Sequence, residues 1–315
     1  MQNEKGAYTN MRIAVIMSTY NGEHYLREQI ESILNQEAVD LELFIRDDGS
    51  SDKTSEIIES YIGDKVHFYQ GANEGYARSF IDCLQMAKNF DYYAFSDQDD
   101  FWKKEKLKKA IELLEARLID DDFPAVYYSN LKVSDAELNV IHITELENRK
   151  QTLESVSMRR SIAGCTMVLN SRLWHEIFKN PITENILSQG HDSFIISLCY
   201  ALGGIVCCDK NAYIHYRQHT SNTAGAPTGI GRRIKKEWKA LHHDKQAEVK
   251  IARSILEGWG KEITAENKDV LNCIAYMGKD WNAKTRILFS SNFTTGDIRL
   301  TIIEKIKVLL TKTRD

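Results

Sequence analysis

The chain has 315 residues, of which 43% are hydrophobic and 27% charged, a composition typical of globular proteins and not of disordered or fibrous ones. Its formal net charge of −4 argues against a general nucleic-acid binder, which would carry an excess of Lys and Arg. The six cysteines include no Cys-x-x-Cys pair, so neither a zinc site nor a disulfide framework is expected. Free thiols in such numbers, together with a polar start that lacks a signal-peptide core, favour a cytoplasmic location.

The first part of the chain alternates between the patterns of strands and helices. Short apolar runs predict strands at 12–18, 41–46, 66–69 and 92–95, and helical spacing predicts helices at 23–35, 53–62, 76–89 and 103–118. This alternation predicts an α/β fold with a mainly parallel central sheet flanked by helices. In such sheets ligands bind beyond the carboxyl ends of the strands, where polar clusters follow at 18–21, 47–52 and 96–100.

The second part of the chain has mixed strands and shorter helices. Strands are expected at 125–133, 163–169 and 211–217. The longest apolar run, 194–208, is too short and too interrupted by glycine to span a bilayer, so it predicts a buried helix, a turn and a buried strand.

A loop rich in Gly and Pro, 225–231, marks a domain boundary. We expect a catalytic domain over 11–225 and a helical, basic region over 226–315. Three interpretations of this region stay open: contact with anionic membrane lipids, packing on the catalytic domain, or formation of a homodimer.

The most informative cluster is Asp97-Gln98-Asp99-Asp100. Three carboxylates this close repel one another unless solvent or a cation offsets their charge. Mg²⁺ and Mn²⁺ take oxygen ligands, often one or two protein carboxylates completed by phosphate and water. The cluster therefore predicts a site for a metal-bound diphosphate, and the alternative is an acidic turn that caps the helix near Trp102.

Each of the other two clusters is weak evidence by itself and becomes informative only together with the others. In 47–52, Asp and Ser favour helix capping, but a second aspartate at a strand end can accept a hydrogen bond from a pyrimidine N–H. The segment 18–22 offers hydroxyls and a tyrosine ring, on which a base can stack. A helix follows it, and the N-terminus of a helix favours anions.

The order of these motifs resembles family 2 of the inverting glycosyltransferases, which have the Rossmann-like GT-A fold. The similarity covers about residues 11–225 and rests on STYNG, RDDGSSD and SDQDDFW in that order. NEGYARSF at 73–80, AGCTMVLN at 163–170, GHDSF at 190–194 and YRQHTSN at 216–222 agree with it. The SDQDDFW and YRQH forms resemble bacterial rhamnosyltransferase-like members.

The resemblance assigns roles to particular residues. The nucleotide and donor-binding residues that it implies are Ser18, Thr19, Tyr20, Asn21, Glu23, Asp48, Arg78, Asp97 and Gln98. Within this set Ser18 and Tyr20 hold the base, Asp48 bonds its N–H, and Arg78 lies near the diphosphate. The implied ligands of a Mn²⁺ or Mg²⁺ ion are Asp99, Asp97 and His219.

Asp192 is implied as the catalytic base that takes the proton from the acceptor hydroxyl. The alternative is an N-cap on a helix over 193–202. This chain has Phe194 near the acid where a Trp often follows in the family, which leaves the acceptor contact open.

The implied reaction moves a sugar from a nucleotide-diphosphate donor, dTDP-L-rhamnose or a UDP-hexose, to a hydroxyl of a cell-surface or lipid-linked glycan. A nucleotidyltransferase would carry a Gly-rich loop with Arg and Lys after its first strand, where this chain has STYNGEHY. A processive synthase would need membrane-spanning helices and a Gln-x-x-Arg-Trp motif. A non-catalytic sugar-nucleotide-binding scaffold of an envelope assembly complex stays open as an alternative.

Overall fold

The computed structural model describes residues 11–118, 122–159, 162–219 and 245–312. The chain forms two compact units: the first comprises Met1–Leu146, Ile162–Lys179 and Gly204–Arg217, and the second Glu147–Ser161, Asn180–Gly203 and Gln218–Asp315. The domain boundary expected near residue 225 and the basic stretch that begins at 232 lie outside the described residues. Each unit is described by itself.

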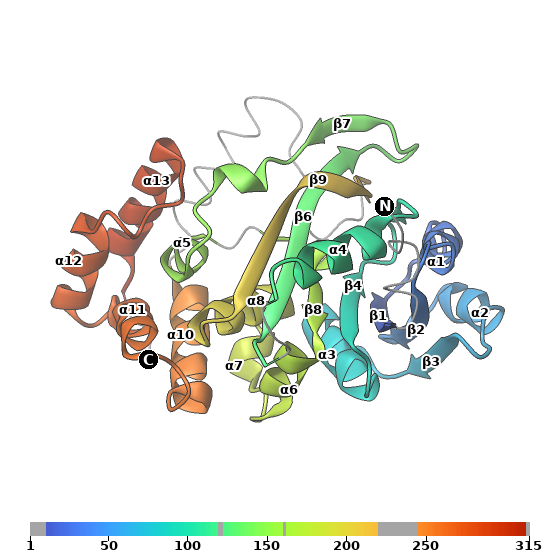
Figure 1. Cartoon of the computed structure of the whole chain (residues 1–315), viewed down its shortest axis with the longest axis horizontal. Helices are drawn as coiled ribbons and strands as arrows, with labels where there is room; N and C mark the ends of the chain where they lie inside the picture. Colours follow the sequence, from blue (N-terminus) through green and yellow to red (C-terminus); the bar gives the residue numbers. More distant parts are fainter. Residues whose placement is uncertain (1–10, 119–121, 160–161, 220–244, 313–315) are drawn as a thin grey trace. The chain divides into compact units, whose positions relative to one another are not determined.

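The first unit is built on one mixed sheet (Figure 1). Its strands are β1 (Arg12–Thr19), β2 (Asp40–Asp47), β3 (Val66–Gln70), β4 (Tyr92–Ser96), β5 (Phe101–Trp102), β6 (Ala125–Ser134), β7 (Val140–Ile143), β8 (Val168–Asn170) and β9 (Ile205–Arg217). The order is β3-β2-β1-β4-β8-β6-β9-β5, and β7 pairs with β6. β3, β2, β1 and β4 run parallel, whereas β8 is antiparallel to both of its neighbours.

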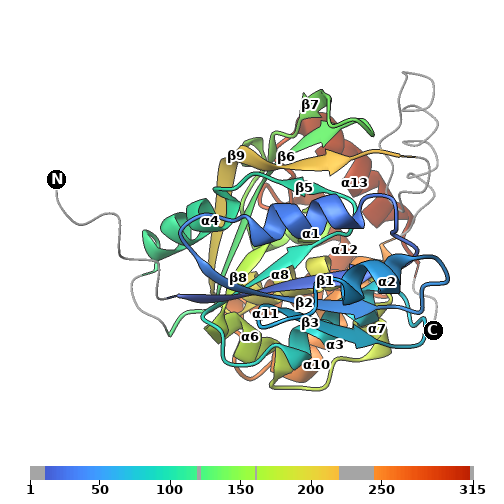
Figure 2. The same cartoon turned by 90° about the vertical axis from the view of Figure 1, so that its right-hand side faces the viewer.

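Helices cover both faces of this sheet (Figure 2). They are α1 (Leu26–Leu34), α2 (Thr54–Glu59), α3 (Tyr76–Met86), α4 (Lys106–Glu115) and α6 (Ser171–Phe178), with short turns η1 (Leu146–Asn148) and η2 (Gly164–Thr166). Alternate residues of β1 point to opposite faces, so Val15 joins a core with Ile30 of α1 and Ile111 of α4. On the other face Trp174 of α6 stacks on Tyr93 of β4.

The parallel first half of the sheet confirms the α/β fold expected from the alternating pattern. The strand expected at 163–169 is wrong in its first part, because η2 occupies Gly164–Thr166 and β8 begins only at Val168. The hydroxyl of Thr166 donates to the carbonyl of Ala163 at 2.7 Å, and this local bond competes with an extended strand. The strand expected at 211–217 is the end of the longer β9, and β5 and β7 were not predicted.

The second unit is helical in its described residues, which confirms the helical C-terminal region. Its helices are α5 (Leu153–Met158), α7 (Glu184–Leu187), α8 (His191–Ala201), α10 (Gln246–Trp259), α11 (Ala265–Tyr276), α12 (Trp281–Phe289) and α13 (Ile298–Leu310). The side chains of Thr264, Asp280 and Asp297 accept backbone hydrogen bonds at the starts of α11, α12 and α13. The run at 194–208 forms the expected helix, turn and strand, with Gly203 at φ +73°.

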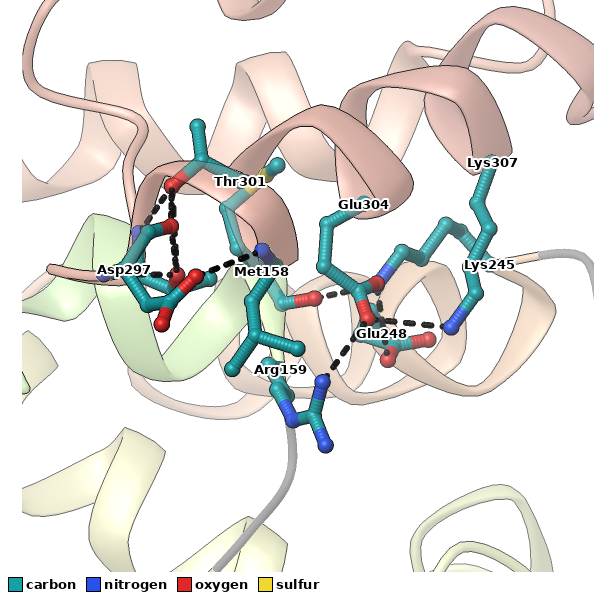
Figure 3. Close-up of polar contacts among 10 residues, drawn as sticks. Met158, Arg159, Lys245, Glu248, Asp297, Thr301, Glu304 and Lys307 are labelled. Carbon is teal, nitrogen blue, oxygen red and sulfur yellow. Dashed lines mark hydrogen bonds and ion pairs between the residues drawn. The ribbon is translucent and has the colours of Figure 1, made fainter. Parts of the chain in front are cut away.

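A buried ion network joins α5, α10 and α13 within this unit (Figure 3). Glu304 of α13 is 2% exposed and pairs with Lys245, with Lys307 at 2.9 Å and with Arg159 at 3.8 Å. Lys245 also donates to the carbonyl of Met158. Burial raises the pKa of Glu304, but the charge and hydrogen bond of Lys245 outweigh it, so the pKa is lowered.

Among the described residues, no helix combines the length and the apolar character needed to cross a bilayer.

Candidate active site

Three loops meet at the carboxyl edge of the parallel strands, as the sequence led us to expect. β1 lies between β2 and β4, with Thr19 opposite Asp47 and Met17 opposite Ser96. The loops after these strands, 20–23, 47–52 and 97–100, therefore lie side by side in the first unit. We call them the first loop, the second loop and the acidic loop.

Asp47 holds the second loop together. This fully buried carboxylate accepts from the hydroxyl of Thr19 and from the backbone N–H of Ser50, both at 2.9 Å. Asp47, the last residue of β2, therefore stabilises the turn that follows the strand. The helix-capping role that the sequence allowed for one of the two aspartates is wrong, because α2 has Lys53 as its cap residue and no side-chain cap bond.

Asp48 is nearly as buried but points to other partners. Its carboxylate accepts from Arg46 at 2.5 Å and from the backbone N–H groups of Glu74 and Gly75 at 3.0 and 2.9 Å. A carboxylate offers about four acceptor positions, so one is left for a further donor. Arg46 was not predicted as a site residue, although the RDDGSSD motif contains it. Its bonds fix the segment before α3, whose first turn carries Arg78.

The first loop is tied to the second by side chains that the sequence assigned to the donor. Asn21, at φ +48°, accepts from the N–H of Ser51 at 2.9 Å, and Glu23 accepts from the N–H of Lys53 at 3.0 Å. Ser18 donates to the hydroxyl of Ser79 at 2.7 Å. These contacts hold the loop and leave the ring of Tyr20 49% exposed above it.

Gln98 connects the acidic loop to the first loop. Its amide accepts from the N–H of Tyr20 at 2.8 Å and donates to the carbonyl of Tyr20 at 3.1 Å. The only residue between the two implied metal ligands, Asp97 and Asp99, is therefore fixed to the backbone beside the exposed ring.

The acidic loop brings together a set of possible metal ligands that differs from the predicted one. Within the described residues, ligand atoms of Asp97, Asp100 and Cys165 lie within 4.8 Å of one another. Asp99 is not in this group. Asp100 is 0% exposed, and its Oδ2 atom has no hydrogen-bond partner among the described residues. Neither Asp100 nor Cys165 was predicted as a site residue, and Cys165 lies in η2, where a strand was expected.

The donor set fits a hard divalent cation through its carboxylates. Burial raises the pKa of Asp100 well above its usual value, and the charges of Asp97 and Asp99 raise it further. A cation beside these carboxylates would offset that repulsion and give the unpaired Oδ2 atom a partner. Mg²⁺ and Mn²⁺ suit the two carboxylates, whereas a thiol is a soft ligand that they do not prefer.

A buried lysine lies beneath the acidic loop. Lys106 is 0% exposed, and its Nζ atom lies 3.5 Å from the centre of the Trp102 ring. Burial lowers the pKa of Lys106 to about 7, although Cys165 and Asp100 act in the opposite direction. Trp102 is 1% exposed and belongs to the core, so its ring is not available to line an acceptor site.

Asp192 and His219 belong to the second unit and are not among the residues gathered on the first. Asp192 is half-buried in the first turn of α8, and its Oδ1 atom accepts from the N–H of Ser193 at 2.6 Å. The alternative of an N-cap is wrong, because α8 begins at His191 and Gly190 is its cap residue. His219 is half-buried two residues after the end of β9.

The chain is similar to proteins of one known family. The family model described as glycosyl transferase family 2 matches residues 14–174. The chain is 32% identical over 225 residues to the dTDP-rhamnosyl transferase RfbG of Shigella flexneri, covering 67% of this chain and 74% of the relative. It is also 32% identical over 164 residues to the putative teichuronic acid biosynthesis glycosyltransferase TuaG of Bacillus subtilis (strain 168), covering 51% of this chain and 62% of the relative.

Two solved structures share the fold at low sequence identity. The crystal structure of S. aureus TarS 1-349 in complex with UDP-GlcNAc aligns with a TM-score of 0.55 and 19% identity, covering 90% of this chain and 77% of that one. The mannosyltransferase PcManGT from Pyrobaculum calidifontis, in complex with GDP-Man and Mn²⁺, aligns with a TM-score of 0.51 and 15% identity, covering 96% and 81%.

The fold is thus the expected GT-A fold, and the protein is a glycosyltransferase. The chain belongs to glycosyl transferase family 2, which confirms the resemblance drawn from its motifs.

Proposed function

We propose that this enzyme moves a sugar from a nucleotide-diphosphate donor to a hydroxyl of a cell-surface glycan, with the help of a divalent cation and with inversion at the anomeric carbon. The observation that carries the proposal is the buried, unpartnered carboxylate oxygen of Asp100 beside Asp97, at an edge where three loops meet. A protein built only to bind a neutral ligand would gain nothing from that uncompensated arrangement.

The donor nucleotide would lie over the first and second loops. The exposed ring of Tyr20 offers a face on which a base can stack, and Asp48 has one acceptor position left for a pyrimidine N–H. Arg78 lies in the first turn of α3, which follows the segment held by Asp48, and its cation would face the diphosphate. Ser18, Thr19, Asn21 and Glu23 would act mainly by holding these loops in place.

Asp97, Asp99 and Asp100 would hold Mn²⁺ or Mg²⁺, and His219 is a further candidate ligand from the second unit. A bound divalent cation would offset the negative charge that develops on the leaving diphosphate. The carboxylates would hold that cation at the edge of the sheet, where the three loops converge. Gln98 ties the same loop to Tyr20, so the nucleotide and the diphosphate would bind at a fixed spacing.

Asp192 would be the general base. Its carboxylate would take the proton of the acceptor hydroxyl while the acceptor oxygen forms a bond to the anomeric carbon. The bond from that carbon to the diphosphate oxygen breaks on the opposite face, and the nucleoside diphosphate leaves with the bonding electrons. One such displacement inverts the configuration of the anomeric carbon.

We propose dTDP-L-rhamnose as the donor, with a UDP-hexose as the alternative. The similarity to the Shigella flexneri dTDP-rhamnosyl transferase supports the first, and the UDP-GlcNAc complex of the TarS structure shows only that this fold accommodates a UDP-sugar. The similarity to a putative teichuronic acid biosynthesis enzyme supports a cell-surface glycan, free or lipid-linked, as the acceptor.

Donor hydrolysis tests this proposal. The protein is incubated with a panel of dTDP- and UDP-sugars in Mn²⁺ or Mg²⁺, with a chelator as control, and the released nucleoside diphosphate is measured. Slow, chelator-sensitive release from one donor supports the transferase and names the sugar. Binding of a nucleotide without release from any donor, even with extracts of lipid-linked glycans as acceptors, supports a non-catalytic scaffold.

We further propose that the enzyme works in the cytoplasm and touches the inner face of the membrane through α13. The exposed apolar side chains of this helix lie along one stripe, at Ile298, Ile302, Ile306, Leu309 and Leu310. Trp281 and Phe289 of α12, of types that favour the membrane interface, are exposed as well. Residues 297–312 hold four cations and two carboxylates, a net positive charge. Both carboxylates are engaged within the protein, as are Lys305 and Lys307 among the cations. This combination suits an anionic lipid surface.

A further inference from the structure

Arg217, the last residue of β9, is buried against the acidic loop. Its Nε atom donates to the carbonyl of Asp99 at 3.0 Å, and its backbone N–H donates to Oδ1 of Asp100 at 3.3 Å. The guanidinium group also pairs with Glu28 of α1 and donates to the carbonyl of Ala136. The side chain is 3% exposed.

We propose that Arg217 is a positioning residue that sets the direction of the carboxylates in the acidic loop, and thereby the affinity for the divalent cation. The proposal rests on the function proposed above. It assigns no contact between Arg217 and the donor or the cation. Its action is through the backbone of Asp99 and the carboxylate of Asp100.

The geometry of the contacts supports this role. Asp100 uses Oδ1 for the N–H of Arg217, and its Oδ2 atom has no hydrogen-bond partner among the described residues. A carboxylate oxygen of Asp100 lies within 4.8 Å of ligand atoms of Asp97 and Cys165. The bond from Nε to Asp99 fixes the peptide that joins the two acids. The same peptide lies between the side chain of Asp99 and that of Asp100, so a change in its orientation would redirect both carboxylates.

The other contacts of Arg217 explain why the guanidinium is held so firmly. It lies 4.3 Å over the ring of Tyr25, which directly precedes α1, and it pairs with Glu28 one turn into that helix. α1 begins just after the first loop. Arg217 thus connects the acidic loop to α1. This is a second connection between the acidic loop and the region of the first loop, in addition to the bonds between Gln98 and Tyr20.

Only arginine provides these contacts together. Its planar group has donors in a fixed fork, so that Nε can serve Asp99 while the two terminal nitrogens serve Ala136 and Glu28. A lysine at this position keeps the charge but has a single nitrogen, which cannot reach three acceptors in different directions. Groups that orient metal ligands typically change metal affinity about 10- to 100-fold when they are removed.

Direct binding of Mn²⁺ tests the proposal with a measurement separate from turnover. Free Mn²⁺ is followed by electron paramagnetic resonance in titrations of wild-type protein, Arg217→Lys and Arg217→Met, each alone and with dTDP or UDP. We expect about tenfold weaker Mn²⁺ binding in Arg217→Met, a smaller loss in Arg217→Lys, and partial recovery of donor hydrolysis at high Mn²⁺.

Arg12→Met is the matched control, because Arg12 also pairs with a glutamate, Glu42, donates to a carbonyl and lies over an aromatic ring, but at the opposite end of β1. Its Mn²⁺ affinity should stay within about twofold of wild type, since it touches no residue of the acidic loop. Circular dichroism and melting temperature show which variants are folded. If Arg217→Met does not fold, the Mn²⁺ affinity of Arg217→Lys tests the proposal. If neither variant folds, Glu28→Gln takes their place. This variant keeps the bond from Arg217 to Asp99, and we expect it to weaken Mn²⁺ binding about threefold.

Two negative results have different meanings. Wild-type protein that binds no Mn²⁺ with or without nucleotide would overturn the metal-dependent function, and this inference with it. Wild-type binding together with unchanged affinity in the folded variants would overturn the positioning role alone and leave Arg217 as a structural residue.

Discussion

Gln98 binds the backbone of Tyr20 through both ends of its side-chain amide, at 2.8 and 3.1 Å. The pairing resembles that of two backbone segments in a sheet, and it joins the acidic loop to the first loop. Gly22 lies against the same amide, and a Cβ atom at this position would come within 2.3 Å of Oε1 of Gln98. The side chain of Gln98 therefore sets the distance between the two loops, and it fits there only because Gly22 has no side chain.

Gly22→Ala should displace the amide of Gln98 and break both of its bonds to Tyr20. With about 1 kcal/mol for each lost bond, we expect donor nucleotide affinity to fall by about tenfold or more. Calorimetric titration with dTDP and UDP measures the change. Gly63→Ala is the control, because no atom lies within 4 Å of a Cβ added there. Equal affinity in Gly22→Ala and wild type would show that the spacing of the two loops does not govern nucleotide binding.

Asp99→Asn and Asp192→Asn should separate metal binding from base catalysis. Asp99→Asn is expected to abolish turnover and metal-assisted donor binding, because an amide is a weaker ligand than a carboxylate. Asp192→Asn should abolish turnover but leave donor affinity nearly intact, since an amide cannot take the acceptor proton. Transfer assays and nucleotide titrations, each with and without Mn²⁺, distinguish the two. Wild-type rates in either variant would refute the role assigned to that residue.

Asp100→Asn tests whether Asp100, which was not among the predicted metal ligands, contributes to the cation site. Asp100 lies with Asp97 and Cys165, so loss of its charge should weaken Mn²⁺ binding about 10-fold or more. Cys165→Ser should change Mn²⁺ affinity much less, because the thiol is a poor ligand for this ion. The same spectroscopic titration serves both variants. A larger effect of Cys165→Ser than of Asp100→Asn would point to a softer metal than Mn²⁺.

Glu304→Gln should destabilise the protein, because it removes one of the two carboxylate partners of the buried cation of Lys245 and leaves only Glu248, at 3.4 Å. Removal of one partner of a buried ion pair costs about 3–5 kcal/mol. Because the pKa of Glu304 is lowered in the folded state, its contribution is complete above the unfolded value of 4.5 and is lost as the pH falls through the folded value.

Urea unfolding at pH 7 and near pH 4 measures this effect. The difference between wild type and Glu304→Gln should begin to shrink at the lower pH, where Glu304 takes up a proton in the unfolded chain but stays charged in the folded protein, in which its pKa is lower. The exposed Glu257→Gln on α10 is the control and should unfold like wild type at both pH values. A difference that is the same at both pH values would mean that packing, and not the charge of Glu304, provides the stability.

The double substitution Ile302→Glu and Ile306→Glu should abolish binding of the protein to vesicles that contain phosphatidylglycerol. Both side chains are exposed on α13, so the change should leave the fold intact while it places negative charge on the apolar stripe. Cosedimentation measures binding, and the exposed Asn282→Glu on α12 is the control. The proposal would be wrong if wild-type protein stays in the supernatant. If that protein also elutes as a dimer and the double variant elutes as a monomer, this face binds a second copy of the chain.

Much of the first unit could be predicted from local sequence patterns. The runs at 12–18, 41–46 and 92–95 became β1, β2 and β4, because apolar strands and their polar turns are specified within a few residues. The convergence of three loops followed from a general property of parallel sheets. The turn η2 was missed, because it is closed by local bonds that apolar periodicity does not reveal: two backbone hydrogen bonds and the bond from the hydroxyl of Thr166 to the carbonyl of Ala163.

By itself, the sequence therefore determined the family, the α/β class and the convergence of the three loops to which we assign the chemistry. Only the tertiary structure decided that Asp100 and Cys165 join Asp97, and that Arg217 holds the backbone of Asp99. Cys165 and Arg217 lie far from the acidic loop along the chain. They reach it because β8 pairs with β4 and β9 pairs with β5, and such long-range pairings leave no trace in local periodicity.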